Sequence, residues 1–363
     1  MFRTKAAATA VAVLACSIAA LGTAQKLPIE NIQLRGDRFH GLSYAEMTPE
    51  QRAFLDHTVN SARAANGNNT TANGPFNVLM RSPEIGDLSQ ALGNSIRFSS
   101  GLSGKVRELA TLMAGRAWSS HYEWYAHARY AKQEGLPDDV IAAIAGHRTP
   151  DLKRMPADEA LAWRVTDEML YTRQITDATY KEALAALGER ELMSTVIIAA
   201  YYEYISMLLN VDRYPLPADA PKGAAAALTT LGKRELIRKT EGMVTARTPL
   251  KNADTDHALD ELRARMSVEQ ELPAVLRDLA RNLVMTHWND PPTEIERGRV
   301  SRELKVAEAF AVELLNTRGV TDETFMKALA TLGERKLVNL IVFMGYANVR
   351  CAQKALAGVE CSI

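Results

Sequence analysis

The strongest constraint on the fold is an internal repeat in this chain. Residues 171–190 (YTRQITDATYKEALAALGER) align with residues 316–335 (NTRGVTDETFMKALATLGER), and the match continues to Tyr201 and Tyr346. The two copies are offset by 145 residues. Self-similarity at a fixed offset is typical of chains built from related structural units. The sequence therefore predicts two units that fold in similar ways.

The second unit is predicted to be the shorter one. Residues 107–110 (RELA) and Trp118 match residues 277–280 (RDLA) and Trp288, but here the offset is 170 residues. Because the downstream offset is only 145, the second copy lacks 25 residues. The missing segment follows Trp118, so the second half is a reduced duplicate of the first.

Two similar triplets are candidates for extending this match towards the N-terminus. They are Arg81-Ser82-Pro83 and Arg247-Thr248-Pro249. We predict a first helical domain over residues 25–215 and a degenerate second repeat over residues 216–363. A length of 363 residues suits two domains, each with its own core.

Apolar residues recur at helical spacing along the mature chain. Ser103 is a candidate N-cap, and the apolar residues that follow it lie on one helix face, at Val106, Leu109, Ala110, Met113 and Ala117. The chain contains no Asn-Gly turn flanked by alternating apolar residues and no run of β-branched strands. The predicted fold class is all-α.

Composition excludes several classes of protein. The chain carries 43 Lys and Arg against 43 Asp and Glu, and this zero net charge argues against a general nucleic-acid-binding protein. Hydrophobic residues make up 47% and charged residues 24%, so the chain is neither disordered nor a polytopic membrane protein. We expect a small-molecule substrate and no nucleic-acid partner.

The first 24 residues have the pattern of a secretory signal peptide. Arg3 and Lys5 precede an uncharged, Ala-rich stretch from Ala6 to Ala24, and Gly22-Thr23-Ala24 offers small residues before a cleavage site. We expect a periplasmic or secreted protein that is not inserted in a membrane after cleavage. A membrane helix and a lipoprotein signal at Cys16 remain alternatives.

One segment carries the residues suited to chemistry. In the segment 107–127 (RELATLMAGRAWSSHYEWYAH), Glu123 and His127 are four residues apart and share one face of a helix. A carboxylate there can orient the imidazole for general acid–base catalysis. Glu108 lies on the preceding helix and would meet the same site if the two helices form a hairpin. A surface ion pair is the alternative interpretation.

This segment resembles the carboxymuconolactone decarboxylase and alkylhydroperoxidase D-like superfamily. The resemblance covers residues 74–209 and rests on the order of four motifs, GPFNVLMRSP (74–83), REL (107–109), YEWYAH (122–127) and GLP (135–137). The peroxidase branch has a Glu, a Cys twelve residues later, a second Cys three residues on and a His four residues after that. In this chain those spacings fall on Glu108, Ser120, Glu123 and His127, so both redox cysteines are replaced.

The resemblance implies an alkylhydroperoxidase D-like helical fold and a lyase that needs no metal and no organic cofactor. His127 is predicted to protonate the substrate carbon, while Glu123 and Glu108 set the tautomer and charge of His127. Four further residues are predicted to bind the substrate, namely Arg116, which would pair with a substrate carboxylate, and Ser120, Trp124 and Tyr122. Core packing is the alternative for the aromatic residues.

Two other functions stay open on the sequence. A peroxidase-like activity, which the superfamily name implies, lacks the thiolate and the resolving thiol that it requires. A non-enzymatic role, as a small-ligand-binding protein or an assembly scaffold, is the other. By resemblance, a homo-oligomer is expected, either a dimer or a trimer.

The remaining histidines are assigned structural roles, and one further acidic residue is a candidate for the pocket. His121 is off the face of His127, which argues against a metal triad with Glu123. His147 lies at a predicted helix end, and His257 and His287 belong to the reduced half. Glu203 aligns with Asn348, and this difference makes it a candidate to face the pocket.

Only two cysteines remain once the leader is removed. Cys351 and Cys361 lie ten residues apart near the C-terminus. In an exported protein they are predicted to form a disulfide, with two free thiols as the alternative. They lack the spacing of a redox pair and lie outside the matching segment.

Overall fold

The computed structural model describes residues 28–61, 72–221, 224, 228, 238–288 and 301–363. The predicted leader and Cys16 lie outside these residues. The described elements are η1 (Ile29–Asn31), η2 (Tyr44–Glu46), α1 (Pro49–Val59), α3 (Phe76–Leu79), α4 (Pro83–Phe98), α5 (Gly104–Ala117), α6 (His121–Gln133), α7 (Asp138–Ala145), α8 (Ala157–Thr172), α9 (Asp177–Asp212), α10 (Ala253–Met266), α11 (Ala274–Trp288), α12 (Arg302–Thr317) and α13 (Asp322–Leu356).

The all-α prediction is confirmed. Over the described ranges, the only strand-like pairing is an isolated bridge between Gln33 and Ser43. Polar side chains cap the helices at positions that the sequence marks. Ser103 accepts a hydrogen bond from the main-chain N–H of Val106 and so caps α5. Thr176 and Thr321 cap α9 and α13 in the same way.

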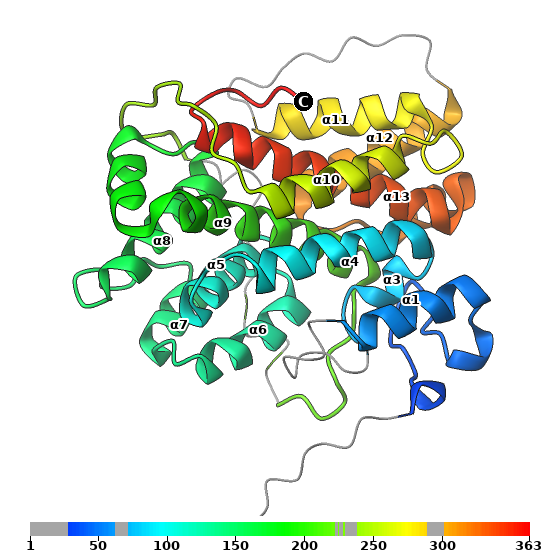
Figure 1. Ribbon diagram of the computed structural model, residues 1–363. Coiled ribbons are helices and arrows are strands. Elements are labelled where there is room, and N and C mark those ends of the chain that lie inside the picture. Colours follow the sequence, from blue (N-terminus) through cyan, green and yellow to red (C-terminus); the bar gives the residue numbers. More distant parts are fainter. Residues whose placement is uncertain (1–27, 62–71, 222–223, 225–227, 229–237, 289–300) are drawn as a thin grey trace, which may run out of the picture.

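Two long helices form the centre of the molecule. The helices α9 and α13 pack against each other, with α5 and α8 packed on α9 and with α11 and α12 packed on α13 (Figure 1). The helices α4 and α10 pack against each other. Each has a kink at a glycine, Gly188 with φ 76° and Gly333 with φ 74°. With ψ near 170°, this backbone conformation is open almost only to glycine. The two kinks are 145 residues apart, as the repeat predicts.

The two halves contact each other through equivalent arginines. The Arg38 guanidinium donates to the main-chain carbonyls of Val211 and Val320, at 3.0 and 2.8 Å. It also pairs with the Asp322 carboxylate at 2.8 Å. Arg38 thus connects the end of α9 to the start of α13.

Arg247 makes the reciprocal contacts. Its guanidinium donates to the carbonyls of Leu356 and Ile175, at 3.0 and 2.7 Å, and pairs with Asp177 at 2.5 Å. Each of these partners is 145 residues from its counterpart at Arg38. Such reciprocal contacts are what two similar units related by an approximate two-fold axis would make. The duplication and the domain boundary after residue 215 stay predictions.

These contacts correct one detail of the alignment. The sequence paired Arg247 with Arg81, but the contacts of Arg247 match those of Arg38. Arg81 instead donates to the carbonyl of His40 and pairs with Glu334 at 3.4 Å. The triplet resemblance was misleading because three residues are too short a match to locate an equivalent position.

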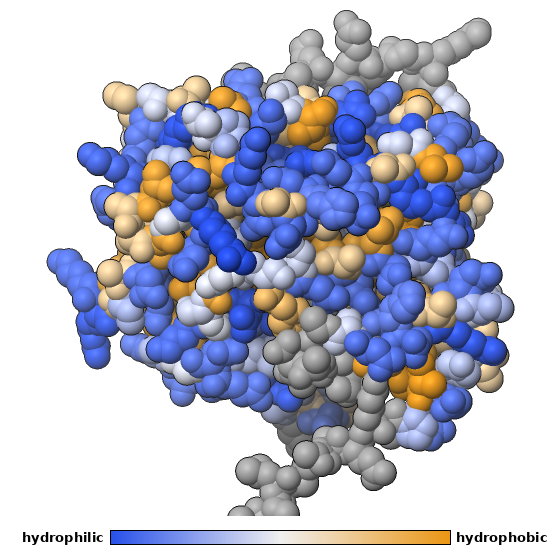
Figure 2. All heavy atoms as spheres, viewed as in Figure 1, coloured by the Kyte–Doolittle hydropathy of each residue, from blue (hydrophilic) through white to orange (hydrophobic). Residues whose placement is uncertain are grey.

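One described helix, α9, is long and apolar enough to cross a membrane. Its apolar window is completely buried within the protein, so α9 is a core helix. The face drawn in Figure 2 is mainly hydrophilic, with apolar side chains in small scattered groups.

Candidate active site

The site begins at a tight turn between α5 and α6. Ser119 has a left-handed backbone, with φ 48°, and the N–H of Ser120 donates to the carbonyl of Gly115 at 2.9 Å. This turn brings α6 back along α5 as a hairpin. Ser120, Glu123 and His127 then fall within one face of α6, because their spacing of three and four residues follows the helical period.

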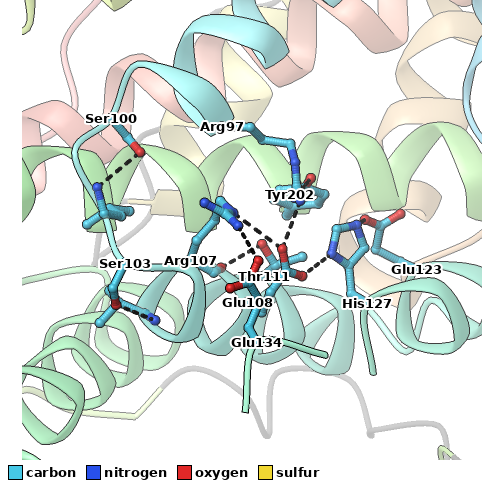
Figure 3. A network of polar contacts seen from close by, with 12 residues as sticks. Arg97, Ser100, Ser103, Arg107, Glu108, Thr111, Glu123, His127, Glu134 and Tyr202 are labelled. Carbon is cyan, nitrogen blue, oxygen red and sulfur yellow. Dashed lines mark hydrogen bonds and ion pairs between the residues drawn. The ribbon is translucent and has the colours of Figure 1, made fainter. Parts of the chain in front are cut away.

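The hairpin brings the three predicted catalytic residues together (Figure 3). His127 Nδ1 lies 2.5 Å from Glu108 Oε2, and His127 Nε2 lies 3.0 Å from Glu123 Oε1. The three residues are buried, with exposed fractions of 6% for His127, 3% for Glu123 and 0% for Glu108. The imidazole is therefore held between two carboxylates away from solvent.

Two further residues, which the sequence analysis missed, join the cluster, and Arg107 Nε lies 3.4 Å from Glu108 Oε1. Arg97, near the end of α4, donates to Glu108 Oε1 at 2.8 Å and to the hydroxyl of Tyr202. The Tyr202 ring, from α9, lies edge-on to the His127 ring at 4.8 Å between centroids. In the sequence, Arg97 stands out only as a charged residue that follows the apolar Ile96. Nothing local marked Tyr202, because α9 is almost uniformly buried.

The charges in this cluster set its protonation. Burial alone would raise the pKa of Glu108, but the charges and hydrogen bonds of His127 and Arg97 lower it to about 2. Burial alone would lower the pKa of His127, but Glu108 and Glu123 raise it above 6.5. The cluster therefore favours the protonated imidazole of His127 beside the ionised Glu108.

The contacts of His127 bear on which residue can pass a proton out of the cluster. Both ring nitrogens of His127 are engaged, so its proton leaves the cluster through one of its two carboxylate partners. Glu108 is closed off by Arg97. Glu123 Oε2 has no hydrogen-bond partner among the described residues, so Glu123, and not His127, is the open end of the chain of contacts.

We predict that this cluster makes stability depend on pH in two directions. Above the ordinary histidine value of 6.5, the unfolded chain releases a proton that folded His127 retains, so stability falls as pH rises through the raised pKa. Below the ordinary glutamate value of 4.5, the unfolded chain takes up a proton that Glu108 takes up only near pH 2, so stability falls again.

Urea unfolding from about pH 3 to about pH 9 measures this dependence. A His127→Asn variant is expected to lose the decline above pH 6.5. His57, whose side chain is 60% exposed, gives the matched control His57→Asn, which should keep the decline. If wild type and His127→Asn declined in parallel, the raised pKa would be refuted.

A cavity of about 410 Å³ opens beside the start of α6. Its walls come from both halves and include Trp118, Ser120, His121, Tyr122, Arg213 and Arg318. Two of the predicted substrate-binding residues, Ser120 and Tyr122, therefore line it. Glu123 does not line the cavity, but it follows Ser120 by one helical turn.

The other two predicted substrate-binding residues lie elsewhere. Arg116 is 2% exposed, and its Nη1 lies 3.5 Å from the Ser119 hydroxyl, behind the turn. Trp124 packs in the hydrophobic core. Neither lines any of the three cavities found along the described segments, because each points from its helix into the protein interior.

The interpretation of Glu203 as a pocket residue was wrong. Glu203 is fully buried and lines none of the three cavities. Its carboxylate accepts two hydrogen bonds from Arg173, both at 3.0 Å, and one from Trp118 Nε1 at 3.0 Å. A third donor, Asn348 Nδ2, lies at 3.0 Å. The difference between Glu203 and Asn348 places one carboxylate between the two halves.

The remaining histidines lie apart from the cluster. His147 packs against Tyr171, His257 pairs with Glu261 on the surface, and His287 contacts Arg173. His121 lines the cavity. Where side chains are described, no three His, Cys, Asp or Glu residues are grouped to hold a metal ion.

Cys351 and Cys361 are joined by a disulfide, with their Cα atoms 4.8 Å apart. They line a different cavity, of about 270 Å³, together with Arg173 and His287. Neither Glu108, Glu123 nor His127 lines that cavity.

Comparison with known proteins identifies the segment that carries the site. No curated protein matches the sequence. The model of the carboxymuconolactone decarboxylase family matches residues 83–166, from the start of α4 into α8. The match includes Glu108, Glu123 and His127. The resemblance drawn from the sequence is thereby confirmed, and residues 83–166 are similar to the carboxymuconolactone decarboxylase family.

Proposed function

We propose that this protein is an exported, cofactor-free lyase that acts on a small carboxylated or lactone substrate by acid–base chemistry. The observation that carries the proposal is the contact chain Arg97–Glu108–His127–Glu123, whose open end lies one helical turn from a cavity. The family match supports the reaction class. The leader pattern in residues 1–24 supports export.

Glu123 is the group that exchanges protons with the substrate. When the bond between the substrate and its carboxylate breaks, CO₂ leaves and the electron pair stays on the adjacent carbon, delocalised by the substrate itself. His127 passes the proton on its Nε2 to Glu123, which delivers it to that carbon. Solvent restores the proton to the imidazole. Glu108 remains ionised throughout and holds the positive charge of His127.

A peroxidase role has less support. Ser120 and Glu123 stand where the peroxidase branch has cysteines, and neither supplies a thiolate. The two cysteines of the described part of the chain are bonded to each other and line another cavity. A ligand-binding or scaffold role has no observation that favours it over acid–base chemistry.

The duplicated arrangement also bears on assembly. We propose that the second half occupies the place of a partner subunit, because the arginine contacts between the halves are reciprocal. A homo-oligomer, dimer or trimer, of these fused units stays our expectation, and light scattering measures it.

The proposal predicts that Glu123→Gln abolishes catalysis. Carboxymuconolactone is the first probe, with CO₂ release and deuterium incorporation from solvent as readouts. We expect the rate to fall by about 10²–10⁴-fold, because an amide cannot transfer the proton. Glu134→Gln, at the exposed end of α6, is the matched control and should keep the wild-type rate.

Three outcomes would contradict the proposal. The first is a full rate in Glu123→Gln, and the second is the absence of both CO₂ release and proton exchange in the wild type. The third is dithiol-dependent reduction of cumene hydroperoxide that thiol alkylation stops, which would favour the peroxidase role.

A further inference from the structure

The cavity beside α6 is completed by the second half of the chain. One wall is the turn between α5 and α6, and the opposite wall is the turn between α12 and α13, at residues 317–320. Arg318 projects from that second turn and is 7% exposed. Its guanidinium lies over the Trp118 ring, 5.1 Å from the centroid. A charge from the second half thus borders the site of the first.

Arg318 has an equivalent in the first half, and the pair shows reciprocal packing. Arg173 precedes it by 145 residues, and both residues end a helix in the left-handed conformation, with φ 59° and 66°. Arg173 lies over the Trp288 ring at 4.6 Å, as Arg318 lies over Trp118. The two arginines therefore share the same backbone conformation and the same kind of contact with a tryptophan ring.

The counter-charges of the two arginines differ. Arg173 pairs with Glu203 through two hydrogen bonds of 3.0 Å. The residue equivalent to Glu203 is Asn348, which carries no charge. Arg318 instead donates to the main-chain carbonyls of Ala117 and Leu315. No carboxylate in the described part of the chain lies within ion-pair distance of it, and its Nη2 donates to no described residue.

A buried arginine without a carboxylate is costly unless an anion accompanies it. Burial, together with the positive charge of Arg173, lowers the pKa of Arg318 to about 10, so the guanidinium still carries its charge at neutral pH. The other cationic residue on the cavity wall, Arg213, is already paired with Asp37 at 2.8 Å and Asp322 at 3.0 Å. Among the described residues, Arg318 is thus the cation on this cavity wall that has no ion-pair partner, and Glu203 acts on it only through its charge at longer range.

A second group in the cavity lacks a partner. Ser120 is 0% exposed, and its hydroxyl has no hydrogen-bond partner. It precedes α6, a helix of 13 residues, without capping it. The N–H groups of a first helical turn and the helix dipole favour an anion at this end. A buried hydroxyl, a helix N-terminus and an arginine thus border the same cavity.

We propose that this cavity binds the carboxylate of a small organic acid between Arg318 and the N-terminus of α6, with the Ser120 hydroxyl donating to it. The inference rests on the proposed function and deepens it, because it assigns the group by which the substrate is held. It also gives the second half a role, since that half supplies the charge that binds the substrate of the first. Arg116, the sequence-based candidate for this role, does not line the cavity.

Binding of simple probes tests the inference without any turnover. Benzoate and its neutral isostere benzamide are titrated into the full-length protein by calorimetry. We expect benzoate to bind and benzamide to bind at least about 10-fold more weakly, because only the acid makes charge-assisted hydrogen bonds. Arg318→Gln should weaken benzoate binding by about 10- to 100-fold. Arg213→Gln, on the same cavity wall, is the matched control and should change it less than about 3-fold.

Two variants at Ser120 protect the test against misfolding of Arg318→Gln. Ser120→Ala should weaken benzoate binding by about 3- to 10-fold through loss of one hydrogen bond. Ser120→Asp places a carboxylate at a favourable N-cap position, so it should raise the melting temperature and abolish benzoate binding.

Three results would overturn the assignment. They are equal binding of benzoate and benzamide, wild-type binding by both Arg318→Gln and Ser120→Asp, or binding of inorganic phosphate with no binding of benzoate. Failure of the proposed function is separable, because Glu123→Gln is expected to lose proton transfer while it still binds benzoate.

Discussion

Glu108→Gln is expected to lower the free energy of unfolding by about 3–5 kcal/mol, the range for removing one partner of a buried ion pair. Glu108 is completely buried and accepts hydrogen bonds from Arg97 at 2.8 Å and His127 at 2.5 Å. Gln retains the shape but not the charge, so the Arg97 guanidinium loses its counter-charge in the protein interior. The loss comes from the stranded charge of Arg97 more than from the lost contacts.

Urea unfolding at neutral pH measures this effect. Glu134 is the matched control, because it pairs with Arg107 at 3.0 Å near the same cluster with 42% of its side chain exposed. Glu134→Gln should cost less than about 1 kcal/mol, since exposed ion pairs are worth little. Equal losses in the two variants would mean that Glu108 is not a buried counter-charge.

Glu203→Gln is expected to cause a loss of similar size, about 3–5 kcal/mol. Glu203 is the only carboxylate of the described residues that pairs with Arg173, and its charge also acts on Arg318. Without it, the two arginines of the interface between the halves repel each other with no intervening negative charge. The Trp118 indole and the Asn348 amide, which donate to this carboxylate, would then have at most a neutral acceptor.

The control for this variant is Glu323→Gln, at the start of α13. Glu323 pairs with Lys327 at 2.6 Å, but both side chains are exposed. This change should leave the free energy of unfolding close to that of the wild type, since exposed ion pairs contribute little. A stability of Glu203→Gln within 1 kcal/mol of the wild type would show that the interface tolerates uncompensated charge, and it would weaken the argument for Arg318 as an anion site.

Much of the active-site hairpin could be predicted from the sequence. Glu123 and His127 share a face because they are four residues apart on a helix, and this is a local property. Glu108 was added through the spacing of the superfamily motif, and the α5–α6 hairpin brings its carboxylate to His127. The engagement of both His127 ring nitrogens was visible only in the structure, and it is the reason that we propose Glu123 as the group that meets the substrate.

Long-range contacts could not be predicted in this way. Arg97 and Tyr202 reach the cluster from α4 and α9, and their hydrogen bond joins residues 105 positions apart. Arg116 appeared suited to bind a substrate because it is a cation near the motif, yet it points behind the turn. Arg318 was not singled out at all, since its importance depends on Trp118, 200 residues earlier in the chain.

The sequence by itself determined the helical class, the family resemblance of residues 83–166 and the spacing of the carboxylates and histidine of the proposed site. Helix periodicity, capping and motif spacing are short-range properties, so a one-dimensional pattern records them. Only the tertiary structure decided which arginine has a counter-charge, which nitrogen faces which carboxylate and which half completes the cavity. Those properties depend on burial and on packing between distant segments, where the cost of an unpaired charge is set by its surroundings.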